Sequence, residues 1–170
     1  MNELTETTLR LFVALLLGGV IGLEREYRSK EAGFRTHFLV AVGSTLFCIV
    51  SQYGFGFDLK DSSRVAAQVV SGIGFLGAGT IIFQRNMVRG LTTAAGLWVT
   101  AAIGLACGTG MYAAAVLSTA IVLLGLEGIS ACLPPHRHHY RRPHLYRHVQ
   151  RKRTSRRPSN QARLPGTLFL

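Results

Sequence analysis

The chain has 170 residues, of which 48% are hydrophobic and only 16% are charged. Soluble domains carry about 25% charged residues, so this composition excludes an ordinary soluble domain. The net charge of +11 is typical of a nucleic-acid-binding protein, but ten of the 19 Lys and Arg residues lie after Cys132, where there is no Asp or Glu. Residues 1–132 are nearly neutral, and we therefore expect no nucleic-acid partner.

Five apolar runs follow one another along the chain, and none of them shows the polar stripe of a soluble amphipathic helix. A helix of about 20 residues crosses the hydrocarbon core of a bilayer. We therefore predict an all-α membrane protein, a compact bundle of about five transmembrane helices, with the first run retained as a helix rather than cleaved as a signal peptide. The runs are Leu9–Leu23, His37–Tyr53, Val65–Phe83, Leu91–Cys107 and Met111–Leu133.

The charges of the connecting segments predict an orientation. Short loops rich in Lys and Arg remain cytoplasmic. The segment 24–36 has four basic residues, the segment 84–90 has two and the segment after Cys132 has ten, whereas the opposite side receives only Arg10, Lys60 and Arg64. Five spans would place the N-terminus outside and the C-terminal tail in the cytoplasm.

The first of these segments is unusually dense in charge. Gly22–His37 has seven formal charges in sixteen residues, and no acidic residue follows between Ser62 and Leu126. We expect Glu24–Tyr27 to continue the first helix, so that Glu24 with Arg28 and Glu26 with Lys30, which are spaced i,i+4, can pair. We expect Gly33 to end this helix. A solvated loop that only sets topology and a functional cytoplasmic site both remain open, and surface ion pairs alone stabilise little.

Small residues recur at helical spacing in several runs. In the fourth run they come every four residues, and pairs such as Ala67/Ser71 and Gly74/Ala78 repeat the pattern in the third. Membrane helices pack closely through such faces, so we predict a tight bundle, or an interface for self-association or another membrane protein. The glycines assigned to helix packing are Gly18, Gly22, Gly72, Gly74, Gly77, Gly79, Gly96, Gly104 and Gly108.

The sequence does not favour an enzyme. Gly72–Gly77 reads GxGxxG, but it lies inside an apolar run with no acidic residue before Glu127, so we interpret it as packing rather than dinucleotide binding. The three cysteines, Cys48, Cys107 and Cys132, also lie in apolar runs and are interpreted as small core residues. No catalytic residue, metal ligand or cofactor is expected.

A transporter is the alternative function. Coupled carriers usually place an ionisable residue within the membrane. Here Glu127 is the only acidic residue of the last four runs, near their predicted cytoplasmic side, where it could pair with Arg85 or Arg89. Backbone carbonyls at Gly72–Gly79 could also line an ion path.

Three stretches in order resemble the MgtC/SapB family of bacterial membrane proteins: "LLLGGVIGLEREYRSKEAGFRTHFLVAVGSTLF", "SGIGFLGAGTII" and "RGLTTAAGLWVTAAIGLACGTG". The resemblance implies a five-span protein of the bacterial inner membrane that is linked to growth under magnesium limitation and, in some members, to virulence. Because carboxylates are missing from the first four runs, we expect a regulator of other membrane proteins rather than a Mg²⁺ carrier. The candidate functional residues are Glu24, Arg25, Glu26, Arg28, Gly33, Arg35, Thr36, His37, Arg89, Thr92, Thr93, Trp98 and Glu127.

Two features depart from the MgtC branch of that family. That branch has Asn at the position of Thr92 and continues into a soluble C-terminal domain, whereas Thr is similar to the wider SapB group. We divide the chain into a transmembrane domain, 1–133, and a basic tail, 134–170, which has no acidic residue and no periodicity. Such a composition predicts disorder. Its basic residues are suited to binding anionic lipid at the cytoplasmic surface.

Overall fold

The computed structural model describes residues 2–55, 61, 63–84 and 87–132, and of residues 128–132 it describes the backbone only. The predicted helical bundle is confirmed, with five helices in the described residues. An antiparallel hairpin of two short strands, which the sequence analysis did not predict, joins the third helix to the fourth. The elements are α1 (Glu3–Tyr27), α2 (Phe34–Tyr53), α3 (Arg64–Gly79), β1 (Ile82–Gln84), β2 (Met87–Arg89), α4 (Leu91–Gly108) and α5 (Tyr112–Cys132).

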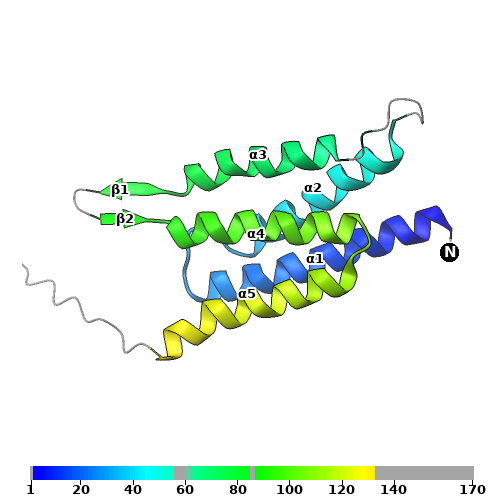
Figure 1. The fold of residues 1–170 in the computed structure, drawn as a ribbon. Coiled ribbons are helices and arrows are strands. Elements are labelled where there is room, and N and C mark those ends of the chain that lie inside the picture. The colour runs from blue at the N-terminus through cyan, green and yellow to red at the C-terminus, as the bar shows by residue number, and fades with distance from the viewer. Residues whose placement is uncertain (1, 56–60, 62, 85–86, 133–170) are drawn as a thin grey trace, which may run out of the picture. The chain divides into compact units, whose positions relative to one another are not determined.

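Successive helices run in opposite directions, so the bundle has two distinct ends (Figure 1). The end that holds the hairpin and the connection from α1 to α2, residues 28–33, is called the hairpin end. The other end, where α1 begins and α4 turns into α5, is called the N-terminal end. The predicted tail, 134–170, lies outside the described residues.

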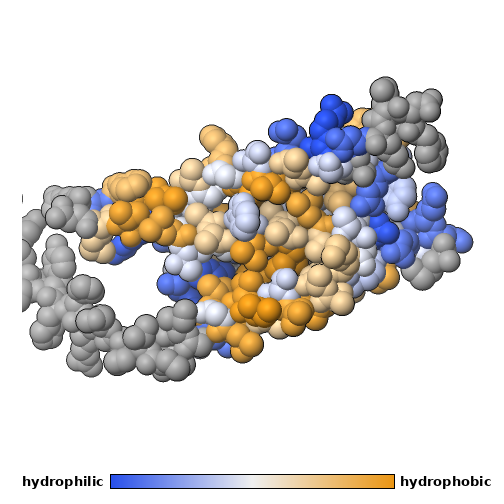
Figure 2. Space-filling model, viewed as in Figure 1, coloured by the Kyte–Doolittle hydropathy of each residue, from blue (hydrophilic) through white to orange (hydrophobic). Residues whose placement is uncertain are grey.

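Three helices, α1, α2 and α4, are long and apolar enough to cross a membrane. Apolar side chains cover much of the middle of the face seen in Figure 2, and hydrophilic ones gather at the N-terminal end. α3 has 16 residues, and the apolar part of α5 extends over Tyr112–Glu127. The chain is therefore a helical membrane protein, and the number of five spans stays a prediction.

α2 packs against α1 through bare backbone. A Cβ atom added at Gly18 would lie 2.5 Å from the Cβ of Ala41, and one added at Gly22 would lie 2.6 Å from the Cα of Phe34. Both distances are far shorter than a van der Waals contact, so only glycine lets α1 approach this closely. The resulting contact is the GxxxG packing of membrane helices.

α4 uses the same device against α2. A Cβ at Gly104 would overlap the carbonyl oxygen of Ala41, and one at Gly108 would lie 2.5 Å from the Cβ of Cys48. α2 is thus held between two glycine faces, one from α1 and one from α4. The buried apolar core fills the space beside these contacts and consists of Ala14, Ile21, Ala41, Ile103, Cys107 and Ala115.

The remaining predicted packing glycines behave differently. Gly77 makes an ordinary contact, since a Cβ there would lie 3.5 Å from the Cβ of Ala94. At Gly72, Gly74 and Gly79 nothing among the described residues lies within 4 Å of an added Cβ. These three glycines therefore form no close contact with another described helix of the chain, and packing against a partner stays a prediction for them.

The third apolar run does not form one helix to Phe83. α3 ends at Gly79, and the β-branched and aromatic residues that follow it form β1 instead. Gly90 then connects β2 to α4 with a φ of +88°, and a Cβ there would overlap the carbonyl oxygen of Thr80. The left-handed backbone and this close approach both require glycine.

α1 continues through Glu24–Tyr27 as predicted, but Gly33 is not the residue that ends it. The helix stops at Tyr27, and Ser29 takes a positive φ of 52°. The amide of Ser29 donates to the carbonyl of Glu26 at 2.9 Å, and the amide of Lys30 donates to that of Arg25 at 3.0 Å, which is a Schellman ending. Gly33, expected to break the helix, instead occupies the N-cap position of α2.

Candidate functional site

The charged segment folds onto the beginning of α4 and forms a polar network at the hairpin end. Arg25 of α1 donates from Nη2 to the hydroxyl oxygen of Thr93 at 3.0 Å. The Thr93 hydroxyl donates in turn to Oε2 of Glu31, in the α1–α2 connection, at 2.7 Å. One hydroxyl group of α4 therefore joins this helix to the end of α1 and to the connection that follows it, 68 and 62 positions earlier in the chain.

Arg25 is a charged side chain in an almost fully buried place. Only 2% of its surface is exposed, and its Nε has no hydrogen-bond partner among the described residues. No carboxylate of the described chain lies within ion-pair distance of it. A buried charge is costly unless it is paired, so Arg25 is the residue of this network that most requires a functional or structural reason.

Glu31 lies at the open side of the same network. The hydrogen bond from Thr93 holds the pKa of the Glu31 carboxyl below its ordinary value, and the nearby charges of Lys30 and Arg25 act in the same direction. Thr93 therefore contacts a carboxylate that stays ionised at neutral pH. Glu31 and Arg25 form no ion pair with each other. Both form a hydrogen bond with the Thr93 hydroxyl, which connects them.

One of the two predicted ion pairs in the charged segment is present. Glu24 pairs with Arg28 one turn further along α1, although neither oxygen of Glu24 accepts a hydrogen bond from the described residues. The pair of Glu26 with Lys30 is not formed, because α1 ends before Lys30 and the i,i+4 geometry is lost. Glu26 instead accepts a hydrogen bond at Oε2 from the amide of Phe34 at 2.9 Å.

This contact makes Glu26 the cap of α2, whose N-cap residue, Gly33, has no side chain. We expect Glu26→Ala to lower the free energy of unfolding by about 1 kcal/mol, the usual effect of losing a helix cap. Chemical denaturation in detergent micelles measures this. Glu127→Ala is the matched control, because Glu127 is an exposed carboxylate without a described partner. Equal stability of the two variants would contradict the capping role.

His37, in the first turn of α2, lies inside the bundle at the hairpin end. It is fully buried, its Nδ1 is 3.0 Å from the carbonyl oxygen of Gly33, and its Nε2 has no described partner. Nε2 faces Gly96 of α4, where an added Cβ would lie 3.6 Å away. Gly96, predicted to pack against a helix, thus lies at ordinary contact distance from the imidazole of α2.

The other candidate residues lie on the surface. Trp98 is 53% exposed on the side of α4, a position suited to lipid, and Glu127 is exposed on α5. No ion pair joins Glu127 to Arg89 in the part of the chain that the structure describes, and Arg85 lies outside it. The described residues contain no group of three His, Cys, Asp or Glu side chains able to hold a metal ion. The exposed candidates are Arg35, Thr36, Arg89, Thr92, Trp98 and Glu127.

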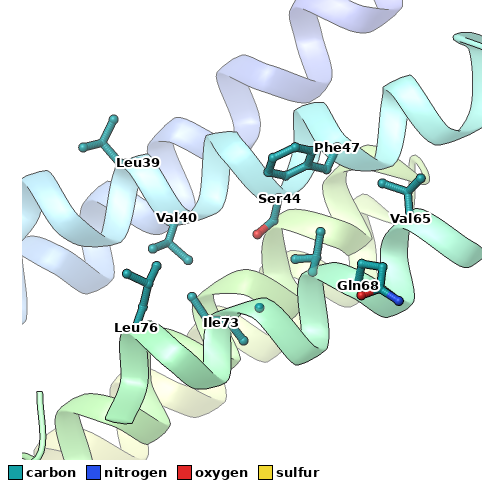
Figure 3. A pocket seen from close by; sticks show the side chains of 10 residues that line it. Leu39, Val40, Ser44, Phe47, Val65, Gln68, Ile73 and Leu76 are labelled. Carbon is teal, nitrogen blue, oxygen red and sulfur yellow. The ribbon is translucent and has the colours of Figure 1, made fainter. Parts of the chain in front are cut away.

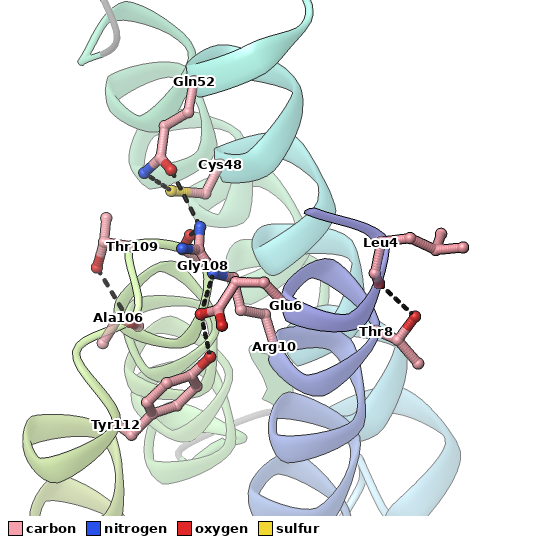
Figure 4. A network of polar contacts seen from close by, with 10 residues as sticks. All are labelled: Leu4, Glu6, Thr8, Arg10, Cys48, Gln52, Ala106, Gly108, Thr109 and Tyr112. Atoms are coloured by element: carbon pink, nitrogen blue, oxygen red, sulfur yellow. Dashed lines mark hydrogen bonds and ion pairs between the residues drawn. The ribbon is translucent and has the colours of Figure 1, made fainter. Parts of the chain in front are cut away.

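A second polar network, at the N-terminal end, was not predicted (Figure 4). Arg10 donates from Nη1 to the carbonyl oxygen of Gly108 at 2.8 Å and to Oε1 of Gln52 at 3.2 Å. Glu6 accepts from Arg10 at 3.3 Å and from the hydroxyl of Tyr112 at 2.9 Å. The i,i+4 spacing of Glu6 and Arg10 was the available sequence signal, but Arg10 was interpreted only as a charge that sets topology.

A third feature is the outward side of α3. An apolar groove of about 470 Å³ separates α3 from α2 and is lined by Val40, Ser44, Gly72 and Ile73 among others (Figure 3). On the other side of α3 from this groove, the exposed residues Ala67, Ser71, Gly74 and Ala78 follow one another at helical spacing. We call these four the α3 stripe. It is a small-residue face at the level of the apolar runs.

Comparison with known proteins assigns the chain to a family. Residues 11–132 match the MgtC family. The protein named "Putative magnesium transporter YhiD" in Escherichia coli K12 is 50% identical over 128 residues, which is 72% of this chain and 60% of that protein. MgtC of Brucella abortus is 48% identical over 136 residues, covering 79% of this chain and 54% of that protein, and MgtC of Salmonella typhimurium is 49% identical over 116 residues, covering 68% and 48%.

The chain thus spans about half to three fifths of the length of these relatives. No solved structure matches it. The family match covers α1 from residue 11 on, the other four helices and the charged segment, and it agrees with the resemblance seen in the motifs. The chain belongs to the MgtC family.

Proposed function

We propose that this chain acts in adaptation to magnesium limitation by binding other membrane proteins, and that it does not itself carry Mg²⁺. The α3 stripe is the observation that carries the proposal. Within the chain, α1 and α4 use glycine faces to contact α2, whereas the α3 stripe offers the same kind of face to the outside. In lipid, a transmembrane helix of another protein is the natural occupant of such a face.

The packing around α2 supports the same proposal. Backbone contacts on both sides of α2, at Gly18 and Gly104, fill the space where an ion path through these helices would run. The polar groups gather instead at the hairpin end, in the network of Arg25, Thr93 and Glu31. With the predicted orientation this network faces the cytoplasm of a bacterial inner-membrane protein, where a regulator would receive its signal.

One relative is named a putative magnesium transporter, so the test has to distinguish partner binding from Mg²⁺ flux. We expect Gly74→Leu to abolish co-purification of the partner and growth under magnesium limitation, at normal membrane abundance, because a large side chain separates the α3 stripe from an incoming helix. Gly125→Leu is the matched control, since Gly125 on α5 is also exposed with open space around it.

Mg²⁺ flux into liposomes that scales with the amount of reconstituted protein would contradict this proposal and favour a small transporter. Wild-type co-purification by Gly74→Leu would also contradict it. Self-association is detected in the same experiment by co-purification of two differently tagged copies.

A further inference from the structure

A polar cavity at the hairpin end has the chemistry of an anion site. It has a volume of about 470 Å³ and lies between the end of α1, the α1–α2 connection, β2 and the first turn of α4. Three basic side chains line it, and one carboxylate faces them. The charged and hydroxyl side chains at its wall are Arg25, Ser29, Lys30, Glu31, Arg89, Thr92 and Thr93.

The basic side chains are not neutralised by the protein. Lys30 and Arg89 are exposed and make no ion pair in the described residues, and Arg25 is 98% buried with its Nε unpartnered. Glu31 contributes a single negative charge, and one of its oxygens already accepts from Thr93. The side chains that line the cavity therefore have a net positive charge. The buried guanidinium of Arg25, which is one of them, has no counter-ion among the described residues.

The beginning of α4 adds to this attraction. Gly90, its N-cap residue, provides no side-chain cap, and Leu91, Thr92 and Thr93 form the first turn on the cavity wall. The first amides of a helix have no partner within the helix, and the helix dipole adds partial positive charge there. Helix N-termini beside basic side chains are suited to phosphate groups, whose oxygens accept several hydrogen bonds.

We propose that this cavity binds a phosphate-type anion, either free phosphate or the phosphate of an anionic lipid headgroup. Lys30, Arg89 and the α4 amides contact the anion, and Arg25 provides the buried positive charge beneath it. A divalent cation is disfavoured by three positive charges against one carboxylate. The inference goes beyond the proposed function and does not depend on partner binding at the α3 stripe.

The test uses the full chain in nanodiscs. In the first arm, inorganic phosphate is titrated into protein in phosphatidylcholine nanodiscs, with chloride at equal ionic strength as the reference, and the Kd is measured by calorimetry. In the second arm, phosphatidylglycerol replaces part of the phosphatidylcholine without free phosphate, and the midpoint of thermal unfolding is compared. Ligand that binds the folded state raises this midpoint.

We expect Lys30→Gln and Arg89→Gln each to weaken phosphate binding at least about tenfold, or to remove the stabilisation by phosphatidylglycerol, since each loses a charge-assisted hydrogen bond. Arg64→Gln is the matched control, because Arg64 is an exposed basic residue at the N-terminal end. The tail is identical in all variants, so its charges cancel from the comparison.

Saturable phosphate binding in the first arm identifies free phosphate as the ligand, and a response only to phosphatidylglycerol identifies the headgroup. The proposal is overturned if wild type responds in neither arm. It is equally overturned if all three variants respond like wild type, or if Arg64→Gln loses as much as the other two.

Discussion

Gly104→Leu is expected to lower the free energy of unfolding by about 3 kcal/mol or more, at the upper end of the usual effect of overpacking. The reason is that even a Cβ at this position would overlap the carbonyl oxygen of Ala41 and lie 2.9 Å from the Cβ of Ser44. Neither backbone can move without separating α4 from α2. Denaturation in detergent and the yield of monodisperse protein measure the effect.

The control is Gly125→Leu, which places the same side chain on an exposed, open position of an apolar helix. Gly104→Ala gives a graded result if the leucine variant cannot be purified, since the Cβ alone already collides with α2. Equal stability of Gly104→Leu and Gly125→Leu would show that the contact between α4 and α2 is not required.

Arg25→Met is expected to keep the fold and abolish growth under magnesium limitation, whereas Arg25→Ala is expected to lose both. Methionine retains most of the volume of a side chain that is 98% buried, and it removes a buried charge that has no ion-pair partner among the described residues and is therefore itself costly for stability. Alanine leaves a cavity, with a cost of about 2–5 kcal/mol for a large buried side chain.

The two variants separate structure from function at Arg25. Membrane abundance and the thermal midpoint report the fold, and growth at low magnesium reports function. Arg64→Met is the control, because Arg64 is an exposed basic residue at the N-terminal end of the bundle. Normal growth of Arg25→Met would show that the positive charge of Arg25 has no functional role, even if Arg25→Ala fails.

The sequence predicted the helices well, because charge-free runs of membrane length leave few alternatives. The prediction was wrong at two places where the conformation of a few backbone residues determines the structure. The end of α1 depends on Ser29 in a positive φ, which is uncommon for a residue other than glycine. The hairpin depends on β-forming residues at the end of an apolar run, where composition alone cannot separate a strand from a helix.

The candidate site was predicted only in its local parts. The pair of Glu24 with Arg28 follows from helical spacing, and so was found. The contact between Arg25 and Thr93 joins residues 68 positions apart, and it exists because α1 and α4 both pack against α2. Arg25 is one of several charged residues in this segment, and the sequence pattern does not distinguish it from the others. That Arg25 is the buried one follows only from the packing of the three helices.

The glycine contacts on both sides of α2 also have a mechanical consequence. Sliding or rotating α2 by even a fraction of a turn would drive side chains into the backbones of α1 and α4, and Arg10 ties the same three helices together at the N-terminal end. α1, α2 and α4 therefore move as one rigid body. α3 meets this body without such interlocking, at the ordinary contact of Gly77 with Ala94, so a small displacement of α3 meets less steric resistance than the same displacement of α2.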